Sequence, residues 1–218
     1  SLQFSQNLLK EKKAFSLHLT DENDLKGLPD TIKEAARHEA KERNLDGWVF
    51  TLDFPSYGPF MQYAENRDLR EKMFMAYNTL CTHENKTNNI DICKRLINIR
   101  RETAQLLGYD TYADYVLVKR MASNVANVYK LLDDLIEAYK PTAVAEKEEL
   151  KQMAKRMNGD DFKLMPWDGA FYSHKLQLEK YNVDAEMVRP YFELSKVIKG
   201  VFGLATRLYG ITFQENKD

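Results

Sequence analysis

Apolar side chains that recur with a helical period dominate this sequence and limit what it can fold into. The clearest stripe has intervals of three or four residues, the spacing at which side chains share one face of an α-helix: Ile92, Leu96, Ile99, Thr103 and Leu106. Asn88 or Asn89 can cap its start, and Gly108 suits the left-handed residue that ends a helix. The pattern predicts a mainly helical protein.

Further helices are expected over residues 2–15, 31–43, 59–64, 67–81, 111–121 and 194–209, and Pro166 is expected to start another. The longest helix should be capped by Ser123 or Asn124 and run to about residue 157. Pro141 lies inside it and predicts a kink or a break, because its ring removes a backbone donor and clashes with the preceding turn. Its expected buried face consists of Val128, Leu131, Leu132, Leu135 and Tyr139.

Two short runs read as β-strands. Leu17 and Leu19 alternate with polar residues, and residues 48–52 are β-branched and aromatic. They can pair as a two-stranded ribbon, which is not stable alone and must lie on helices. Residues 211–213 look like the beginning of another strand. We therefore predict a single, mainly α, multi-helix domain over residues 1–218 with a small two-stranded β element, and a sub-boundary near residues 82–89.

The charge balance argues against binding to nucleic acid or to a membrane. Lysine and arginine number 32 and aspartate and glutamate 33, giving a net charge of −1, whereas nucleic-acid binding requires a clustered basic surface. No apolar run approaches the roughly 20 residues of a membrane helix. Cys81 and Cys93 alone make no disulfide framework, so reduced thiols are expected.

Metal and catalytic motifs are weak throughout. A zinc-protease helix places two histidines four residues apart with a glutamate beside the first, but Glu42 follows His38 and Thr87 follows His83 at that distance. Cys81, His83 and Cys93 offer soft ligands without paired spacing. The sequence also lacks a G-x-S-x-G elbow and glycine-rich phosphate loops. We therefore expect no catalytic, cofactor-binding or metal-binding residue in this chain.

The aromatic stretch around residues 166–172 is more informative. Trp167 and Phe171 lie four apart, as do Asp168 and Tyr172, so a helix here has two aromatic-rich faces. Core packing of large rings is the ordinary interpretation. The functional alternative is that Trp167, Phe171 and Tyr172 form part of the wall of a peptide-binding channel.

Several motifs in order resemble the thimet oligopeptidase family of zinc metallopeptidases. They are Gly27-Leu28-Pro29, residues 48–53 followed by Pro55-Ser56-Tyr57, the helix start at residues 66–72, Leu106-Leu107-Gly108-Tyr109 with residues 112–115, and the Trp167-Asp168 segment. Met61-Gln62-Tyr63-Ala64 and Pro166-Trp167-Asp168 look most similar to the peptidyl-dipeptidase (dipeptidyl carboxypeptidase) branch. Each motif is weak alone, but their order along the chain is specific.

This resemblance implies one lobe of a mostly helical bacterial enzyme that holds zinc, hydrolyses short peptides in a deep channel and releases C-terminal dipeptides. The family's H-E-x-x-H zinc helix is absent from this sequence. The resemblance therefore implies a fragment that is inactive alone and holds no zinc, in a polypeptide of the cytoplasm or periplasm.

A free-standing helical module that binds peptides or proteins is the alternative function. It predicts a stop codon near Asp218 and an exposed apolar groove, whereas the peptidase predicts an in-frame H-E-x-x-H further along the gene. A lobe without its neighbour should also self-associate, because exposed apolar patches often mark lost interfaces.

Overall fold

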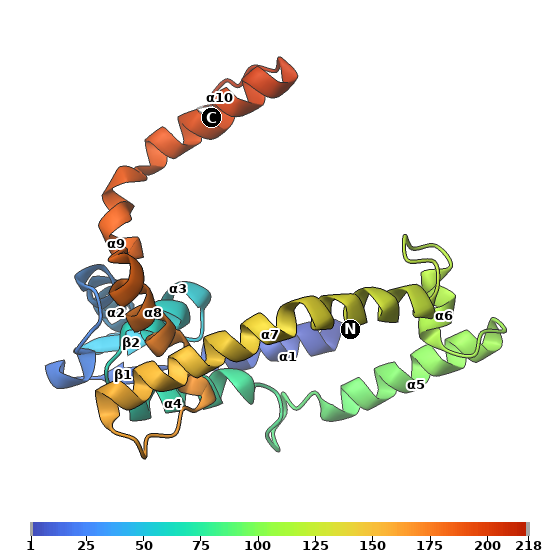
Figure 1. Ribbon diagram of the computed structural model, residues 1–218, viewed down its shortest axis with the longest axis horizontal. Helices are drawn as coiled ribbons and strands as arrows, with labels where there is room; N and C mark the ends of the chain where they lie inside the picture. The colour runs from blue at the N-terminus through green and yellow to red at the C-terminus, as the bar shows by residue number, and fades with distance from the viewer. Residues whose placement is uncertain (1, 217–218) are drawn as a thin grey trace. The chain divides into compact units, whose positions relative to one another are not determined.

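The structure is a computed structural model that describes residues 2–216. It divides into two compact units, one ending at Ser173 and one beginning at His174. The described residues form ten α-helices, three short 3₁₀ turns and one two-stranded sheet (Figure 1). The prediction of a mainly helical fold with a small β element is therefore confirmed.

The sheet pairs the two runs that the sequence singled out. β1 (Leu17–Leu19) and β2 (Trp48–Phe50) are antiparallel, with Leu17 opposite Phe50 and Leu19 opposite Trp48. Both side chains of each pair are buried. Since so short a ribbon cannot bury its own surface, it depends on the helices around it.

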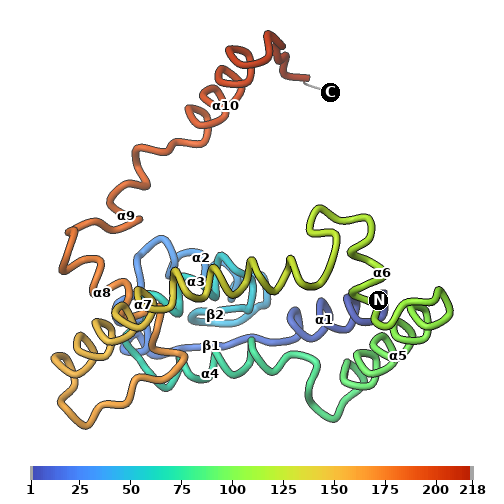
Figure 2. Tube along the Cα trace, turned by 45° about the vertical axis from the view of Figure 1, so that its right-hand side comes forward, coloured from blue at the N-terminus to red at the C-terminus, as the bar shows by residue number. Residues whose placement is uncertain are grey.

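Three helices supply that cover in the first unit. α2 (Asp30–Glu42) and α3 (Phe54–Tyr63) pack beside β2, as Figure 2 shows, and α4 (Arg67–Asn78) packs on α3. The buried core consists of Leu17, Leu19, Leu25, Leu28, Ala36, Trp48, Phe50, Leu52, Phe60, Met61, Tyr63, Ala64 and Met73. This core holds the two strands and these three helices together in the first unit.

Local capping explains most of the helix boundaries. The 3₁₀ turn η1 (Glu22–Leu25) begins where the Asp21 carboxylate accepts the Asn23 amide hydrogen, and Asn66 caps α4 through the Leu69 amide. α3 begins at residue 54 rather than 59, because Pro55 fits the first turn of a helix. α4 ends at Asn78 rather than near residue 81, and its last carbonyls accept hydrogen bonds from the side chains of Asn78 and Thr79.

Beyond the core, α5 (Ile90–Leu106) leads away from the strands and α7 (Val125–Asn158) leads back, joined through α6 (Tyr112–Leu117), which packs on both (Figure 1). The Asn124 side chain caps α7 by accepting the Asn127 amide. A face of α7 expected to be buried is instead exposed at Leu131, Leu132, Leu135 and Tyr139, and the α5 stripe is exposed at Ile99 and Leu106. Amphipathic periodicity identifies an apolar helix face, but it does not show that these 218 residues include the surface that packs against it.

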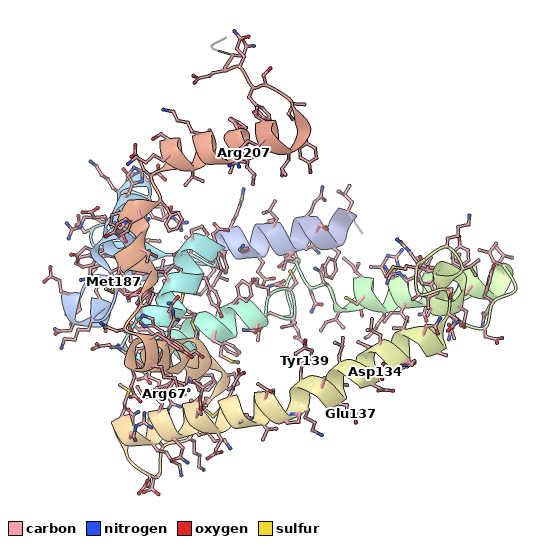
Figure 3. All side chains as sticks on the ribbon, turned by 45° about the horizontal axis from the view of Figure 1, so that its top comes forward. Arg67, Asp134, Glu137, Tyr139, Met187 and Arg207 are labelled. Atoms are coloured by element: carbon pink, nitrogen blue, oxygen red, sulfur yellow. The ribbon has the colours of Figure 1, made fainter. Side chains whose placement is uncertain are left out.

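Of the kink or break expected at Pro141, the break is wrong, because α7 continues through this residue as one helix of 34 residues (Figures 1 and 3). The kink stays a prediction. Proline lacks the amide hydrogen that would bond to the Glu137 carbonyl four residues earlier. Glu137, Tyr139 and Pro141 are all exposed, so water can hydrate that carbonyl and the helix can tolerate the proline.

The second unit contains the end of α8 (Gly169–Tyr181), then α9 (Ala185–Val188), the 3₁₀ turn η3 (Arg189–Tyr191) and α10 (Leu194–Tyr209). α10 has the bounds expected of the amphipathic run. Residues 211–213 form no strand, in contrast to the expectation, because a strand requires a hydrogen-bonded neighbour. No helix within residues 2–216 is both long enough and apolar enough to cross a bilayer.

Candidate functional site

The aromatic stretch begins with a short capped turn. Pro166 starts the 3₁₀ turn η2 (Pro166–Asp168), as the sequence predicts, and α8 follows directly. The Asp168 carboxylate turns back and accepts the amide hydrogen of Met165 at 3.0 Å. Asp168 therefore fixes the start of the segment that carries Trp167, Phe171 and Tyr172.

Two arginines of α4 converge on the same carboxylate, and we call Asp168, Arg67 and Arg70 the Asp168 clamp. Arg67 donates from Nε to both carboxylate oxygens at 3.1 Å and from an Nη to Oδ2 at 2.8 Å. Arg70 donates to Oδ1 at 2.9 Å. Asp168 is 0% exposed and Arg70 1%, so the clamp is an almost fully buried ion pair supported by a half-exposed second arginine.

The remaining contacts of the arginines join three segments of the first unit. Arg70 donates to the carbonyls of Ala64 and Glu65, and its guanidinium lies 4.2 Å from the centre of the Phe171 ring. Arg67 donates to the Lys163 carbonyl and lies over the Phe162 ring, near the turn that follows α7 (Figure 3). Cations over aromatic faces in a desolvated site are attractive, so the clamp ties α4 to the turn after α7 and to α8.

The clamp holds Asp168 in its ionised form. Burial alone would raise the pKa of this carboxyl group, but hydrogen bonds from Arg67, the Met165 amide and Arg70 outweigh burial and lower the pKa. The same contacts raise the pKa of the Arg67 guanidinium, against the effect of its own burial. A carboxylate that is buried, saturated with donors and hard to protonate is a poor general base, so the arrangement is suited to holding segments together.

Acid should release the clamp. Because the pKa of Asp168 in the folded chain lies below the ordinary value of 3.8, its stabilising contribution is complete above that pH and is lost as the pH falls through the folded pKa. We expect the difference in free energy of unfolding between the natural chain and Asp168→Asn to be constant above about pH 5 and to shrink as the pH falls below the ordinary pKa of 3.8. Urea unfolding at each pH measures it, and a difference independent of pH would contradict this account.

The three proposed channel residues lie in different surroundings. Phe171 and Tyr172 belong to a second buried cluster with Met153 and Ala154 of α7, whereas Trp167 is half-buried against the first core. The Tyr172 hydroxyl accepts a hydrogen bond of 2.7 Å from Asn158, and burial raises the pKa of this phenol. Their role in a channel wall stays a prediction.

Sequence reasoning missed the two arginines. Arg67 and Arg70 are three residues apart on one helix face, and the sequence pattern marks them only as members of the helix start at residues 66–72. No sequence spacing links either arginine to Asp168, because the partners lie about a hundred positions apart along the chain. The signal available was an aspartate directly after a proline and a tryptophan, in a segment otherwise rich in apolar rings.

The histidines and cysteines are scattered. His38 and Glu42 share an exposed helix face at 3.7 Å, and His83 pairs with Thr79 at 3.2 Å. His174 lies 3.3 Å from Asp184 within the second unit. Both cysteines are free thiols. Among the described residues, no three His, Cys, Asp or Glu side chains gather where they could hold a metal ion, so the residues present do not fit a zinc site.

Comparison with known proteins identifies relatives across the whole length of the chain. It is 38% identical over 220 residues to "Oligopeptidase A" of Escherichia coli K12, covering 99% of this chain and 32% of that protein. It is 37% identical over 222 residues to the Arabidopsis thaliana "Organellar oligopeptidase A, chloroplastic/mitochondrial", covering 98% and 28%. It is also 31% identical over 218 residues to the E. coli "Dipeptidyl carboxypeptidase", covering 99% and 32%.

The chain thus spans about a third of the length of these curated relatives. The family model described as "Peptidase family M3" matches residues 60–218, which include α4, the Asp168 clamp and the aromatic segment. The relatives include both oligopeptidases and dipeptidyl carboxypeptidases, so the finer resemblance to peptidyl-dipeptidases is not singled out. Because the match covers well over half of the chain, this chain belongs to peptidase family M3.

Proposed function

We propose that this chain is one lobe of a zinc metallopeptidase that hydrolyses short peptides. The observation that carries the proposal is the family match over residues 60–218, together with relatives named oligopeptidase along nearly the whole chain. A cytoplasmic or periplasmic location belongs to the same proposal. No residue of this chain is assigned a catalytic role.

The proposal assigns the zinc ligands and the base to residues outside the printed sequence. H-E-x-x-H does not occur in the 218 residues, and the relatives are about three times longer. When bound elsewhere in the polypeptide, zinc would activate the water that attacks the peptide bond. What this chain contributes is a stable helical scaffold, held by the core around β1 and β2 and by the Asp168 clamp.

Exposed apolar faces support the idea that this lobe packs against something larger. The exposed side chains include Ile97 and Ile99 on α5, Leu131 and Leu132 on α7, and Leu194, Val201 and Leu208 on α10. Exposed apolar side chains on one helix face often mark an interface. On its own the chain is therefore expected to self-associate, and light scattering showing a clean monomer at high concentration would contradict this.

The aromatic segment fits a channel wall in one arrangement. Phe171 and Tyr172 are 5% and 3% exposed, so they would support the wall from behind. Trp167 is only half-buried as a residue, so it is the one of the three that could meet a peptide. Substituting Trp167 should therefore have a larger effect on the KM for peptides than on the free energy of unfolding of the lobe.

Release of C-terminal dipeptides is the finer part of the proposal. It is supported by the resemblance of residues 61–64 and 166–168 to peptidyl-dipeptidases and by the 31% identity to a dipeptidyl carboxypeptidase. Mass spectrometry of the products of one peptide separates the two modes. Successive loss of dipeptides supports release from the C-terminus, whereas a single internal cut supports an endopeptidase.

A non-catalytic module that binds peptides or proteins is the second candidate, and the same exposed helix faces favour it. The gene beyond codon 218 is the first discriminator, since an in-frame H-E-x-x-H supports the peptidase. The encoded polypeptide should then cleave a short internally quenched peptide, lose that activity with a zinc chelator, and lose it by about 10²–10⁴-fold when the glutamate of the motif becomes glutamine. A polypeptide that ends near Asp218 and still binds peptides would favour the module.

A further inference from the structure

One face of α1 (Leu2–Ala14) holds the loop that leads into α5. Phe4, Asn7 and Glu11 are spaced by three and four residues, so they follow one another along the same side of the helix. All three make hydrogen bonds to residues 81–89, at separations of 85, 82 and 70 positions in the sequence. This loop is the segment in which a sub-boundary was expected.

Glu11 binds three residues along the loop through its two carboxylate oxygens. Its Oε2 accepts the backbone amide of Cys81 at 2.6 Å and the hydroxyl of Thr87 at 3.1 Å. Its Oε1 accepts from the side-chain amide of Asn85 at 3.4 Å. Hydrogen bonds to an ionised acceptor are about twice as strong as neutral ones, so one side chain holds three points of the loop.

The end of the loop is fixed by a buried pair of amides. The Asn89 backbone amide donates to the Cys81 carbonyl at 2.8 Å, which closes the loop upon itself. The Asn89 side chain accepts from Asn7 at 2.9 Å and donates to the Phe4 carbonyl at 3.1 Å. Asn7 and Asn89 are both buried, and α5 begins at the very next residue.

Cys81 lies at the centre of this arrangement. Its φ of 61° falls in the left-handed region that residues with a side chain rarely adopt, so surrounding contacts must hold it there. The side chain is 3% exposed. Burial, and then the neighbouring Glu11 carboxylate, raise the pKa of the thiol to about 11. A buried thiol that stays protonated is unreactive.

We propose that residues 81–89 form a latch, in which the Glu11 carboxylate closes the loop on α1, keeps the Cys81 thiol shielded and fixes where α5 leaves the core. Releasing the carboxylate frees the loop locally while the core around β1 and β2 stays folded. The latch accounts for how a polar nine-residue connection can position a 17-residue helix.

The test is thiol labelling of Glu11→Gln in the full natural polypeptide, read at the level of single peptides by mass spectrometry. Glutamine keeps the size of the side chain but removes the charge and one acceptor oxygen. We expect the labelling rate of Cys81 to rise at least about tenfold, with the rate of exposed Cys93 unchanged as the internal reference. Glu84→Gln, an exposed glutamate in the same loop, is the matched control and should leave both rates unchanged.

Low concentrations of urea separate local opening from global unfolding. Labelling through the latch should be nearly independent of urea, because little surface is exposed when only the loop opens. Thr87→Ala, which removes one donor, should give a smaller increase of the same kind. The proposal is overturned if Glu11→Gln leaves the Cys81 rate unchanged, or if the increase rises with urea as steeply as global unfolding does.

Discussion

Asp168→Asn is expected to lower the free energy of unfolding of the first unit by about 3–5 kcal/mol, the cost typical of removing one partner of a buried ion pair. Arg70 is 1% exposed and would remain buried after losing the carboxylate with which it pairs. Asparagine can still accept a hydrogen bond, but it cannot satisfy Arg67, Arg70 and the Met165 amide together. The loss is therefore electrostatic rather than a matter of size.

Urea unfolding followed by circular dichroism measures this loss. Asp161→Asn is the matched control, since Asp161 is an exposed aspartate in the loop that precedes the clamp, and it should change stability by less than about 0.5 kcal/mol. Replacing both partners, as Asp168→Asn with Arg70→Met, should restore part of the stability, because the fully buried charge of Arg70 is then removed together with its partner. A loss below about 1 kcal/mol in the single variant would show that the clamp is not a structural joint.

Phe50→Ala should be as damaging, at about 3–5 kcal/mol, because it empties a fully buried aromatic position. Phe50 is 0% exposed, ends β2 and lies opposite Leu17 in the sheet. Its ring meets that of Phe60 edge-on with centroids 4.7 Å apart. The substitution removes the contact between the sheet and α3 and leaves a cavity that a short ribbon cannot collapse to fill.

Phe54→Ala provides the comparison. Phe54 is 79% exposed and lies four residues further along the same chain segment, so the same chemical change should cost less than about 0.5 kcal/mol. If the free energy of unfolding depends on denaturant with the same slope in both variants, their denaturant midpoints give the ratio of the two stability losses. Equal losses in both variants would mean that the core is not organised around β2.

The elements that could be predicted from the sequence are those with a strong local signal. Alternation at Leu17 and Leu19 and the aromatic run from Trp48 were enough to predict the strands and their pairing, because register and burial follow from the side-chain pattern. The α10 bounds followed from its amphipathic period, and α7 is capped by Asn124, one of the two predicted caps. In each case the deciding interactions span only a few residues.

The features that could not be predicted depend on distant partners. Arg67 and Asp168 are 101 positions apart, and Glu11 and Cys81 are 70 apart, so no local period reveals either pair. The exposed faces of α5 and α7 show the same limit in reverse: Leu131 and Ile99 have the pattern of core residues without a core to enter. The helical run through Pro141 depended on solvent access to the Glu137 carbonyl, which spacing alone does not report.

Because α7 is unbroken, a small rotation at one end of it becomes a large displacement at the other. At a rise of 1.5 Å per residue, about 42 Å separate Val125 from its buried anchor at Met153 and Ala154. A rotation of about 5° at that anchor would therefore move the far end of the helix by about 4 Å, roughly the thickness of an extended peptide. Adding or removing one methyl group where Met153 packs against Phe171 would therefore displace the N-terminal end of α7, with every hydrogen bond of the helix intact.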